Sequence, residues 1–545
     1  SIGNVTATAM GNDAEVNLNG WVGAEYGNVG SVTLTANGAS AYAGMNVYAG
    51  AGVNTNGTES VSDDSAYGGN VGDVTLRAQG DGSSVNSYIE TDGVFGGDEK
   101  YLAAGRVGNV SLSVAGKDAY GYVEVNAQSG GSIGNVTATG VGMYAGMDVY
   151  ASAGMGNIGA LNVSVEGLGT YVNLYASAGA GMDNNGTTDI TTDDKGWGGS
   201  IGSVSLSAKG NGASASGYVS SDGVFGGDEQ YFAGGNVGAV TVAATGAGSE
   251  AELYVSAYSG GSIGNVTATA TGLASSVDVG AWASMGSVGS VAATANGAGS
   301  YAWASVYASG GVNTNGTTDV TTDDRVYGGG VRDVTVLAAG EHSYAGTEVY
   351  TSGVFSEGDT SLTGGNGGNV GNVTISATGL DASTEAYVYA YSGGSIGNVT
   401  GTATGEWASV YADVYAEIGN VGAVNVTAAG AGSYAGAFVS AGAGQDATGN
   451  VTIGGNVGPI TLRVAGDESY AQGRVQTDGV FTGDEKYVAA GNIGSITVGA
   501  TGNGAYASFA AHAYSGGSIG NVTATAMGND AGVNLNRWVG GVGAE

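Results

Sequence analysis

The stretch Ile2-Gly3-Asn4-Val5-Thr6 decides the fold, because the same step returns along the whole chain. Each copy has an apolar residue, a glycine, one variable position, a second apolar residue and usually Thr, Ser or Asn. The gaps between copies run from 25 to 43 residues and repeat in groups of four. Such a period is typical of solenoids, in which each repeat adds one layer to a shared core. The seventeen copies begin at Ile2, Val29, Val71, Val107, Ile133, Ile158, Ile201, Val237, Ile263, Val288, Val331, Val370, Ile396, Val421, Val457, Ile493 and Ile519.

Two alternating runs follow each copy of the step. In the first repeat, residues 5–9 alternate apolar and polar, residues 11–13 are turn formers, and residues 14–19 alternate again. Period-two alternation bounded by turn residues predicts two half-buried strands. We therefore predict an all-β fold, an elongated β-solenoid of about seventeen two-strand rungs with almost no helix. An antiparallel stack of β-hairpins would use the same strands and is the alternative. The solenoid is favoured because corresponding positions are alike from rung to rung.

The repeats group into larger units. The marker Gly-Gly-Ser-Ile-Gly-Asn-Val-Thr divides the chain into units 1–131, 132–261, 262–394 and 395–517, followed by the start of a fifth unit, 518–545. Residues 518–539 match residues 1–22 at all but two positions. Neither end carries the polar capping unit that solenoids need for solubility, so we expect neighbouring copies or a longer parent protein.

The charge balance limits the partners. The chain has 12 Lys and Arg against 47 Asp and Glu, a net charge of −35. This surface would repel nucleic acid and anionic membranes, and no apolar run reaches the length of a membrane-spanning helix. With no cysteine and two distant histidines, His342 and His512, we find no nucleophile or metal cluster. The acids recur in register, as structural features do, so we predict that the protein is not an enzyme.

Acidic insertions are the candidate metal sites. Calcium takes six to eight oxygen ligands, and glycine-rich turns let carboxylates and carbonyls converge on it. We therefore predict Ca²⁺ as the candidate ion, although the spacing matches neither an EF-hand nor a calcium-binding nonapeptide. The alternative interpretation is a solvated acidic loop. The candidate ligands are Asp63, Asp64, Asp92, Asp98, Glu99, Asp193, Asp194, Asp222, Asp228, Glu229, Asp323, Asp324, Asp478, Asp484 and Glu485.

Three outward residue types offer further hypotheses. Thr-x-Thr pairs such as Thr6 and Thr8 form ladders like those of ice-binding solenoids, but other rungs interrupt them. Asn-x-Thr triplets, as at Asn4, would be either glycan acceptors or part of a ladder within the repeat. Tyrosines such as Tyr42 and Tyr48 lie opposite the core face, where they would stack, contact a neighbouring solenoid or bind a sugar.

Taken together, the glycine-rich acidic repeats resemble the secreted bacterial β-strand-repeat proteins, which include surface filaments, surface-layer-like proteins and giant adhesins. The resemblance covers the whole chain through the Ile/Val-Gly-Asn-Val-Thr step and Tyr-Ser-Gly-Gly at 258–261, 391–394 and 514–517. It implies an extracellular or cell-surface location, calcium dependence and no catalysis.

We therefore expect a structural protein that self-assembles, end to end or laterally, into an extracellular fibre or surface coat, with cations bridging its acidic surface. Its partners would be copies of itself and divalent cations. Two alternatives remain at this point. The chain is the stalk of a large adhesin, or it is a glycan-binding surface protein.

Overall fold

The computed structural model describes the strands of every rung but not several short segments between them. The described residues are 1–54, 65–95, 101–183, 195–225, 231–313, 325–327, 329–353, 368–391, 393–445, 452–453, 455–481, 487–489, 491–514 and 516–539. They form two compact units, residues 1–264 and 265–545. Across these ranges every regular element is a β-strand and none is a helix. No helix in the same ranges is long and apolar enough to cross a membrane.

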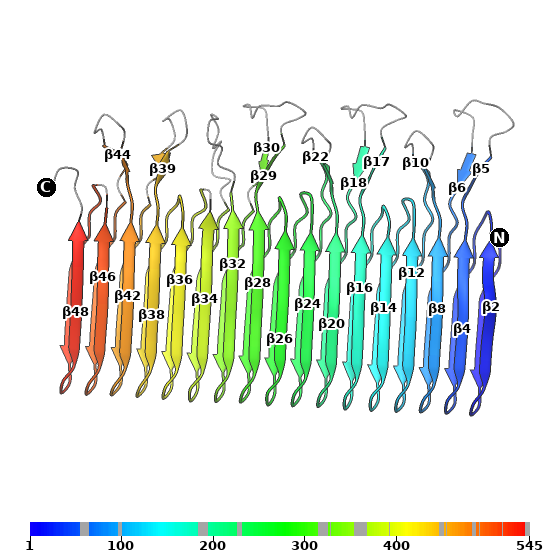
Figure 1. The fold of residues 1–545 in the computed structure, drawn as a ribbon, viewed down its shortest axis with the longest axis horizontal. Coiled ribbons are helices and arrows are strands. Elements are labelled where there is room, and N and C mark those ends of the chain that lie inside the picture. Colours follow the sequence, from blue (N-terminus) through cyan, green and yellow to red (C-terminus); the bar gives the residue numbers. More distant parts are fainter. Residues whose placement is uncertain are drawn as a thin grey trace. The chain divides into compact units, whose positions relative to one another are not determined.

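Unit 1 contains two parallel sheets of eight strands each. Each rung places its first strand, six residues long, in sheet I and its second strand, of eight to ten residues, in sheet II (Figure 1). Sheet I consists of β1 (Val5–Met10), β3 (Val32–Asn37), β7 (Val74–Gln79), β11 (Val110–Ala115), β13 (Val136–Val141), β15 (Leu161–Glu166), β19 (Val204–Lys209) and β23 (Val240–Thr245). Sheet II consists of β2 (Glu15–Ala24), β4 (Tyr42–Ala49), β8 (Ser84–Thr91), β12 (Tyr120–Ala127), β14 (Gly146–Ala153), β16 (Tyr171–Ala178), β20 (Ser214–Ser221) and β24 (Glu250–Ala257).

Unit 2 repeats this plan with nine strands in each sheet. Its sheet I consists of β25 (Val266–Thr271), β27 (Val291–Asn296), β31 (Val334–Ala339), β33 (Val373–Thr378), β35 (Val399–Thr404), β37 (Val424–Ala429), β41 (Ile460–Ala465), β45 (Ile496–Thr501) and β47 (Val522–Met527). Its sheet II consists of β26 (Ser276–Ala283), β28 (Tyr301–Ser309), β32 (Tyr344–Ser352), β34 (Ser383–Tyr391), β36 (Ser409–Ala416), β38 (Tyr434–Ala441), β42 (Tyr470–Thr477), β46 (Tyr506–Ala513) and β48 (Gly532–Val539).

The strands of successive rungs pair in parallel and in register. Val32 of β3 lies opposite Val5 of β1 and Val74 of β7, and the same match continues along sheet I. In sheet II, Tyr42 lies opposite Glu15 and Ser84. Because the two strands of a rung lie in different sheets, they do not pair with each other. The β-solenoid prediction is confirmed, and the antiparallel hairpin stack is excluded for these sheets.

The core lies between the two sheets of each unit. Alternate strand residues point inward, so Leu34, Leu76 and Leu112 form a column in which no side chain is more than 1% exposed. Each such leucine contributes about 1.5–3 kcal/mol on burial. Most other inward residues are Ala or Val, which keeps the core thin. The first apolar residue of each repeated step forms an isolated parallel β-bridge with its counterparts in the neighbouring rungs, as Val29 does with Ile2 and Val71. These bridges line one corner of the solenoid.

Glycine is abundant because the turns stack as closely as the strands. At Gly38, where φ is +140°, an added Cβ would lie 2.2 Å from the carbonyl oxygen of Gly11 in the preceding rung. Gly80 has φ +117° and would approach the carbonyl oxygen of Gly38 in the same way. Only glycine combines this backbone conformation with this close approach.

The variable position of the repeated step carries a side-chain ladder. The Asn4 Oδ1 accepts a hydrogen bond of 3.0 Å from the Ser31 N–H, its counterpart in the next rung. Asn135 accepts from Ala160 N–H at 2.9 Å in the same way. The asparagine of the Asn-x-Thr triplet therefore has the ladder role at these rungs. Pro459, which lacks an N–H, follows a rung in which this position is Ala423 and offers no acceptor.

The sequence predicted the insertions as loops, but in the structure each of the following insertions begins and ends in a short strand, and the two strands pair antiparallel. They lie beyond the carboxyl ends of sheet II strands (Figure 1). The pairs in unit 1 are β5 (Gly52–Asn54) with β6 (Ser65–Tyr67), β9 (Val94–Phe95) with β10 (Tyr101–Ala103), β17 (Gly181–Asp183) with β18 (Lys195–Trp197), and β21 (Val224–Phe225) with β22 (Tyr231–Ala233). Those in unit 2 are β29 (Gly311–Asn313) with β30 (Arg325–Tyr327), β39 (Gly444–Gln445) with β40 (Thr452–Ile453), and β43 (Val480–Phe481) with β44 (Tyr487–Ala489).

Candidate functional site

Three of the predicted metal ligands lie at equivalent places at the bases of hairpins. Asp92, Asp222 and Asp478 directly follow β8, β20 and β42, just before β9, β21 and β43. The other twelve candidates lie outside the described residues: Asp63, Asp64, Asp98, Glu99, Asp193, Asp194, Asp228, Glu229, Asp323, Asp324, Asp484 and Glu485.

Backbone bonds to neighbouring segments hold these aspartates in place. The Asp92 N–H donates to the Ala49 carbonyl at 3.0 Å, and the Asp92 carbonyl accepts from the Gly69 N–H at 3.0 Å. Asp222 repeats both contacts, since its N–H donates to Ala178 at 2.9 Å. Its carbonyl accepts from Gly199 at 2.8 Å. These bonds fix the backbone at the hairpin base, but any residue except proline could make them, so they do not explain the choice of aspartate.

The side chains of these aspartates differ in their surroundings. The Asp92 Oδ2 accepts a hydrogen bond of 3.2 Å from the Tyr48 hydroxyl. Burial raises the pKa of the Asp222 carboxyl above its usual range. Across the described ranges, no three Asp, Glu or His side chains lie close enough together to hold a metal ion. The calcium hypothesis depends on the acids that lie outside the described residues and stays a prediction.

The outer face of sheet II is an aromatic surface. In unit 2, Trp282, Tyr307, Tyr350 and Tyr389 lie opposite one another on successive strands. Their ring centroids are 4.9, 5.0 and 5.0 Å apart, with interplanar angles of 12° to 22°. In unit 1, Tyr150, Tyr175 and Tyr218 lie opposite one another, with centroids 6.3 and 5.6 Å apart. The Tyr122 ring lies 5.6 Å from the Tyr150 ring on the diagonal, because Tyr122 is opposite Asp148. Register therefore turns a repeated outward tyrosine into a continuous ladder of rings.

Carboxylates accept hydrogen bonds from these phenols. The Tyr350 hydroxyl donates to Glu348 Oε1 at 2.6 Å, and the Tyr122 hydroxyl donates to Glu124 Oε2 at 2.6 Å. In both pairs the residues are two apart on one strand, so they share its outer face. Burial and the neighbouring Glu385 carboxylate, which accepts its hydrogen bond, raise the pKa of Tyr387 to about 12. The phenols therefore stay protonated as donors.

Ring stacking changes the interpretation of this face as a sugar platform. A pyranose binds to an open ring face, but within the column each ring face is covered by the ring of the next rung. The sequence predicted outward tyrosines with three possible roles, and in these columns the rings stack on one another. Which rings stack is set by the parallel register of the strands.

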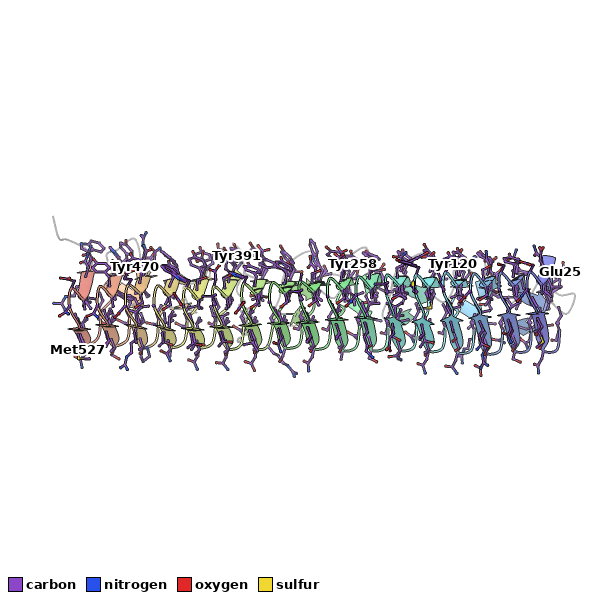
Figure 2. The ribbon with its side chains drawn as sticks, turned by 90° about the horizontal axis from the view of Figure 1, so that it is seen from below. Glu25, Tyr120, Tyr258, Tyr391, Tyr470 and Met527 are labelled. Carbon is purple, nitrogen blue, oxygen red and sulfur yellow. The ribbon has the colours of Figure 1, made fainter. Side chains whose placement is uncertain are left out.

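The outer face of sheet I in unit 2 has small, mostly polar side chains in place of the aromatic rings and carboxylates of sheet II. Outward positions of β25 through β37 in unit 2 hold Thr, Ser, Asn, Ala and one Leu, and none is charged. In Figure 2, Tyr391 and Tyr470 project on the sheet II side of unit 2, and Met527 projects on the sheet I side. In unit 1 the charges on sheet I include Glu166 and Lys209, which pair at 2.9 Å.

Comparison of this chain with protein-family models, with curated proteins and with solved structures found no match.

Proposed function

We propose that this chain is a structural protein, a β-solenoid subunit that self-assembles into an extracellular fibre or surface coat. The observation that supports the proposal most is the equivalence of the rung interfaces. Parallel pairing, register and corner ladders recur from rung to rung within each unit, so the surface that joins two rungs can also join two chains.

The edge of the last rung has the groups that such a junction needs. The first inward residue of a sheet I strand donates its N–H to the following rung, as Val32 does to Asp73 at 2.9 Å and Ile496 to Asn521 at 2.7 Å. Val522 of β47 is the corresponding residue in the last rung. Unpaired strand edges of this kind are templates for pairing with another chain.

A second copy supplies a matching strand. Strands β1 and β47 have the same sequence, Val-Thr-Ala-Thr-Ala-Met. Stacking β1 of one copy on β47 of another, in the register used inside each unit, would place Val5 opposite Val522. This contact is heterologous and does not close, so it generates filaments. In a longer polypeptide the same edge would receive the next rung, which is the adhesin-stalk alternative.

Charge favours one surface for side-by-side contact. Two chains of net charge −35 repel each other, and the repulsion is weakest where a face carries no charge. The six sheet I strands from β25 to β37 offer roughly 600 Å² of uncharged surface, against about 800 Å² per partner in a standard interface. Divalent cations would lower the repulsion elsewhere.

A proline on the exposed edge tests end-to-end assembly. Ala524, two residues after Val522, also lies inward, so its N–H faces the free edge of β47. Among the described strands β47 pairs with β45 alone, so the Ala524→Pro variant removes a donor from the other side of β47 and blocks a further strand. We expect sedimentation velocity to show assembly of the wild type and of the control Ala524→Val, but not of Ala524→Pro. Equal assembly of all three proteins would refute pairing through this edge.

A further inference from the structure

The aromatic column of unit 2 stops at one rung. Tyr389 of β34 lies opposite Tyr415 of β36, but the next position, in β38, is Ser440, and the position after that is Gln476 of β42. The rings also lose their parallel stacking here, since Tyr415 is tilted by 53° from Tyr389. A serine in place of a tyrosine removes the ring that would have covered Tyr415.

A hollow of about 360 Å³ lies where this ring is missing. Its lining includes the rings of Tyr415 and Phe438 together with Ser440. The centroid of the Phe438 ring lies 5.7 Å from that of Tyr411 in the preceding rung. Among the described rings, none of a following rung stacks on Tyr415 or Phe438. Unlike the rings inside the column, these two therefore have surface available to a ligand.

Opposite charges stand on either side of Phe438. Asp413 of β36 and Arg474 of β42 both lie opposite Phe438, one rung before it and one rung after it. Their Cα atoms are therefore two strand spacings apart, roughly 9.6 Å. The Asp413 Oδ2 accepts from the Tyr389 hydroxyl at 3.2 Å, and Arg474 Nη2 donates to Gln476 Oε1 at 3.2 Å. Within the described ranges Arg474 has no ion-pair partner.

This combination selects among ligand types. Aromatic walls favour a ring with apolar faces, and a carboxylate and a guanidinium at opposite sides favour hydroxyls around its edge. The two side-chain charges balance, so no net charge is required of the ligand. A free amino acid carries both of its charges on one carbon, too close together to bridge strands two rungs apart. A sugar ring can reach both groups.

We propose that this hollow binds one pyranose residue of a glycan, with Tyr415 and Phe438 against the ring and with Asp413 and Arg474 on its hydroxyls. The site does not depend on the proposed assembly. It lies where the aromatic column of unit 2 ends, and Ser440 is the first residue after the last ring of that column.

Completing the column gives the sharpest test. The Ser440→Tyr variant adds the missing ring and fills the hollow, and Ser508→Tyr adds a tyrosine to the same face of β46 as the matched control. The probes are the methyl glycosides of glucose, galactose, mannose and glucuronic acid, measured by saturation-transfer NMR on the full chain. Circular dichroism checks that each variant keeps its strands.

We expect at least one glycoside to bind the wild type and Ser508→Tyr with a millimolar dissociation constant, and none to bind Ser440→Tyr. Replacing Arg474 by Gln should weaken binding roughly tenfold. Binding of the glucuronide alone would support the site and identify Arg474 as the carboxylate partner. No binding of any probe to the wild type, or equal binding to Ser440→Tyr, would overturn the proposal.

Discussion

Two glycines in one turn should differ in how much stability they lose on substitution by alanine. Gly210 and Gly212 both follow β19 and both have positive φ, +123° and +62°. A Cβ on Gly212 would have no atom within 4 Å, whereas a Cβ on Gly210 would lie 2.3 Å from the carbonyl oxygen of Gly167 in the preceding rung. Gly212→Ala therefore adds backbone strain alone, about 1 kcal/mol. Gly210→Ala adds strain and a backbone clash that the stacked rung cannot relieve cheaply, together roughly 3 kcal/mol.

Hydrogen exchange measures this difference locally. A solenoid opens rung by rung, so a single unfolding free energy is less informative than exchange rates in peptides covering β15 and β19. At about 1.4 kcal/mol per tenfold, exchange should be about fivefold faster in Gly212→Ala and about a hundredfold faster in Gly210→Ala. Equal rates in the two variants would refute the close stacking of turns as the reason for glycine at this position.

Three further predictions concern the ladders, the tyrosines and the hairpins. Ala160→Asn should stabilise the chain by about 0.5–1 kcal/mol, because the new side chain would accept a hydrogen bond from the Ser203 N–H of the next rung. The control Ala423→Asn should not stabilise the chain, because it faces Pro459, which has no N–H. Equal shifts of the melting temperature in the two variants would contradict the ladder. Because the pKa of Tyr387 rises from 10.0 to about 12 on folding, the unfolded chain loses the phenol proton at a lower pH than the folded chain. The contribution of the protonated Tyr387 to stability is therefore complete below pH 10 and lost by about pH 12. Melting temperatures across this range should fall less in Tyr387→Phe. Replacing Asp98 by Asn and Glu99 by Gln should abolish one calorimetric calcium site, while Glu166→Gln on sheet I should leave every site intact.

The sequence predicted the rungs because the alternating strand residues and the turn residues both recur with each copy of the five-residue step. Residues 5–9 had to alternate, since Ala7 and Ala9 are buried and Thr6 and Thr8 are exposed. The choice between parallel and antiparallel stacking was harder, because both use the same strands and the same turns. Similarity between corresponding positions, such as Val5, Val32 and Val74, was the correct guide.

The side-chain ladder also leaves a signal in the sequence. The position of Asn4 varies from rung to rung, yet it holds mostly residues with a short acceptor, and its single proline follows an alanine. That pairing of Ala423 with Pro459 is the signal that one side chain accepts from the next backbone N–H.

The hollow at Ser440 could not be predicted without the register. In the sequence Ser440 is one of many outward serines, and only its place opposite Tyr415 shows that the aromatic column ends there. For the metal sites the sequence still gives the fuller account, since most of the candidate acids lie beyond the described residues.

Electron microscopy of the purified chain, first with calcium and then with a chelator, tests self-assembly most directly. The account predicts long fibres with strands stacked ~4.8 Å apart along the axis and an axial repeat of one chain length. Loss of the fibres in chelator would place cations at the junctions. Separate particles of one chain under both conditions would contradict self-assembly and leave the adhesin stalk as the better explanation.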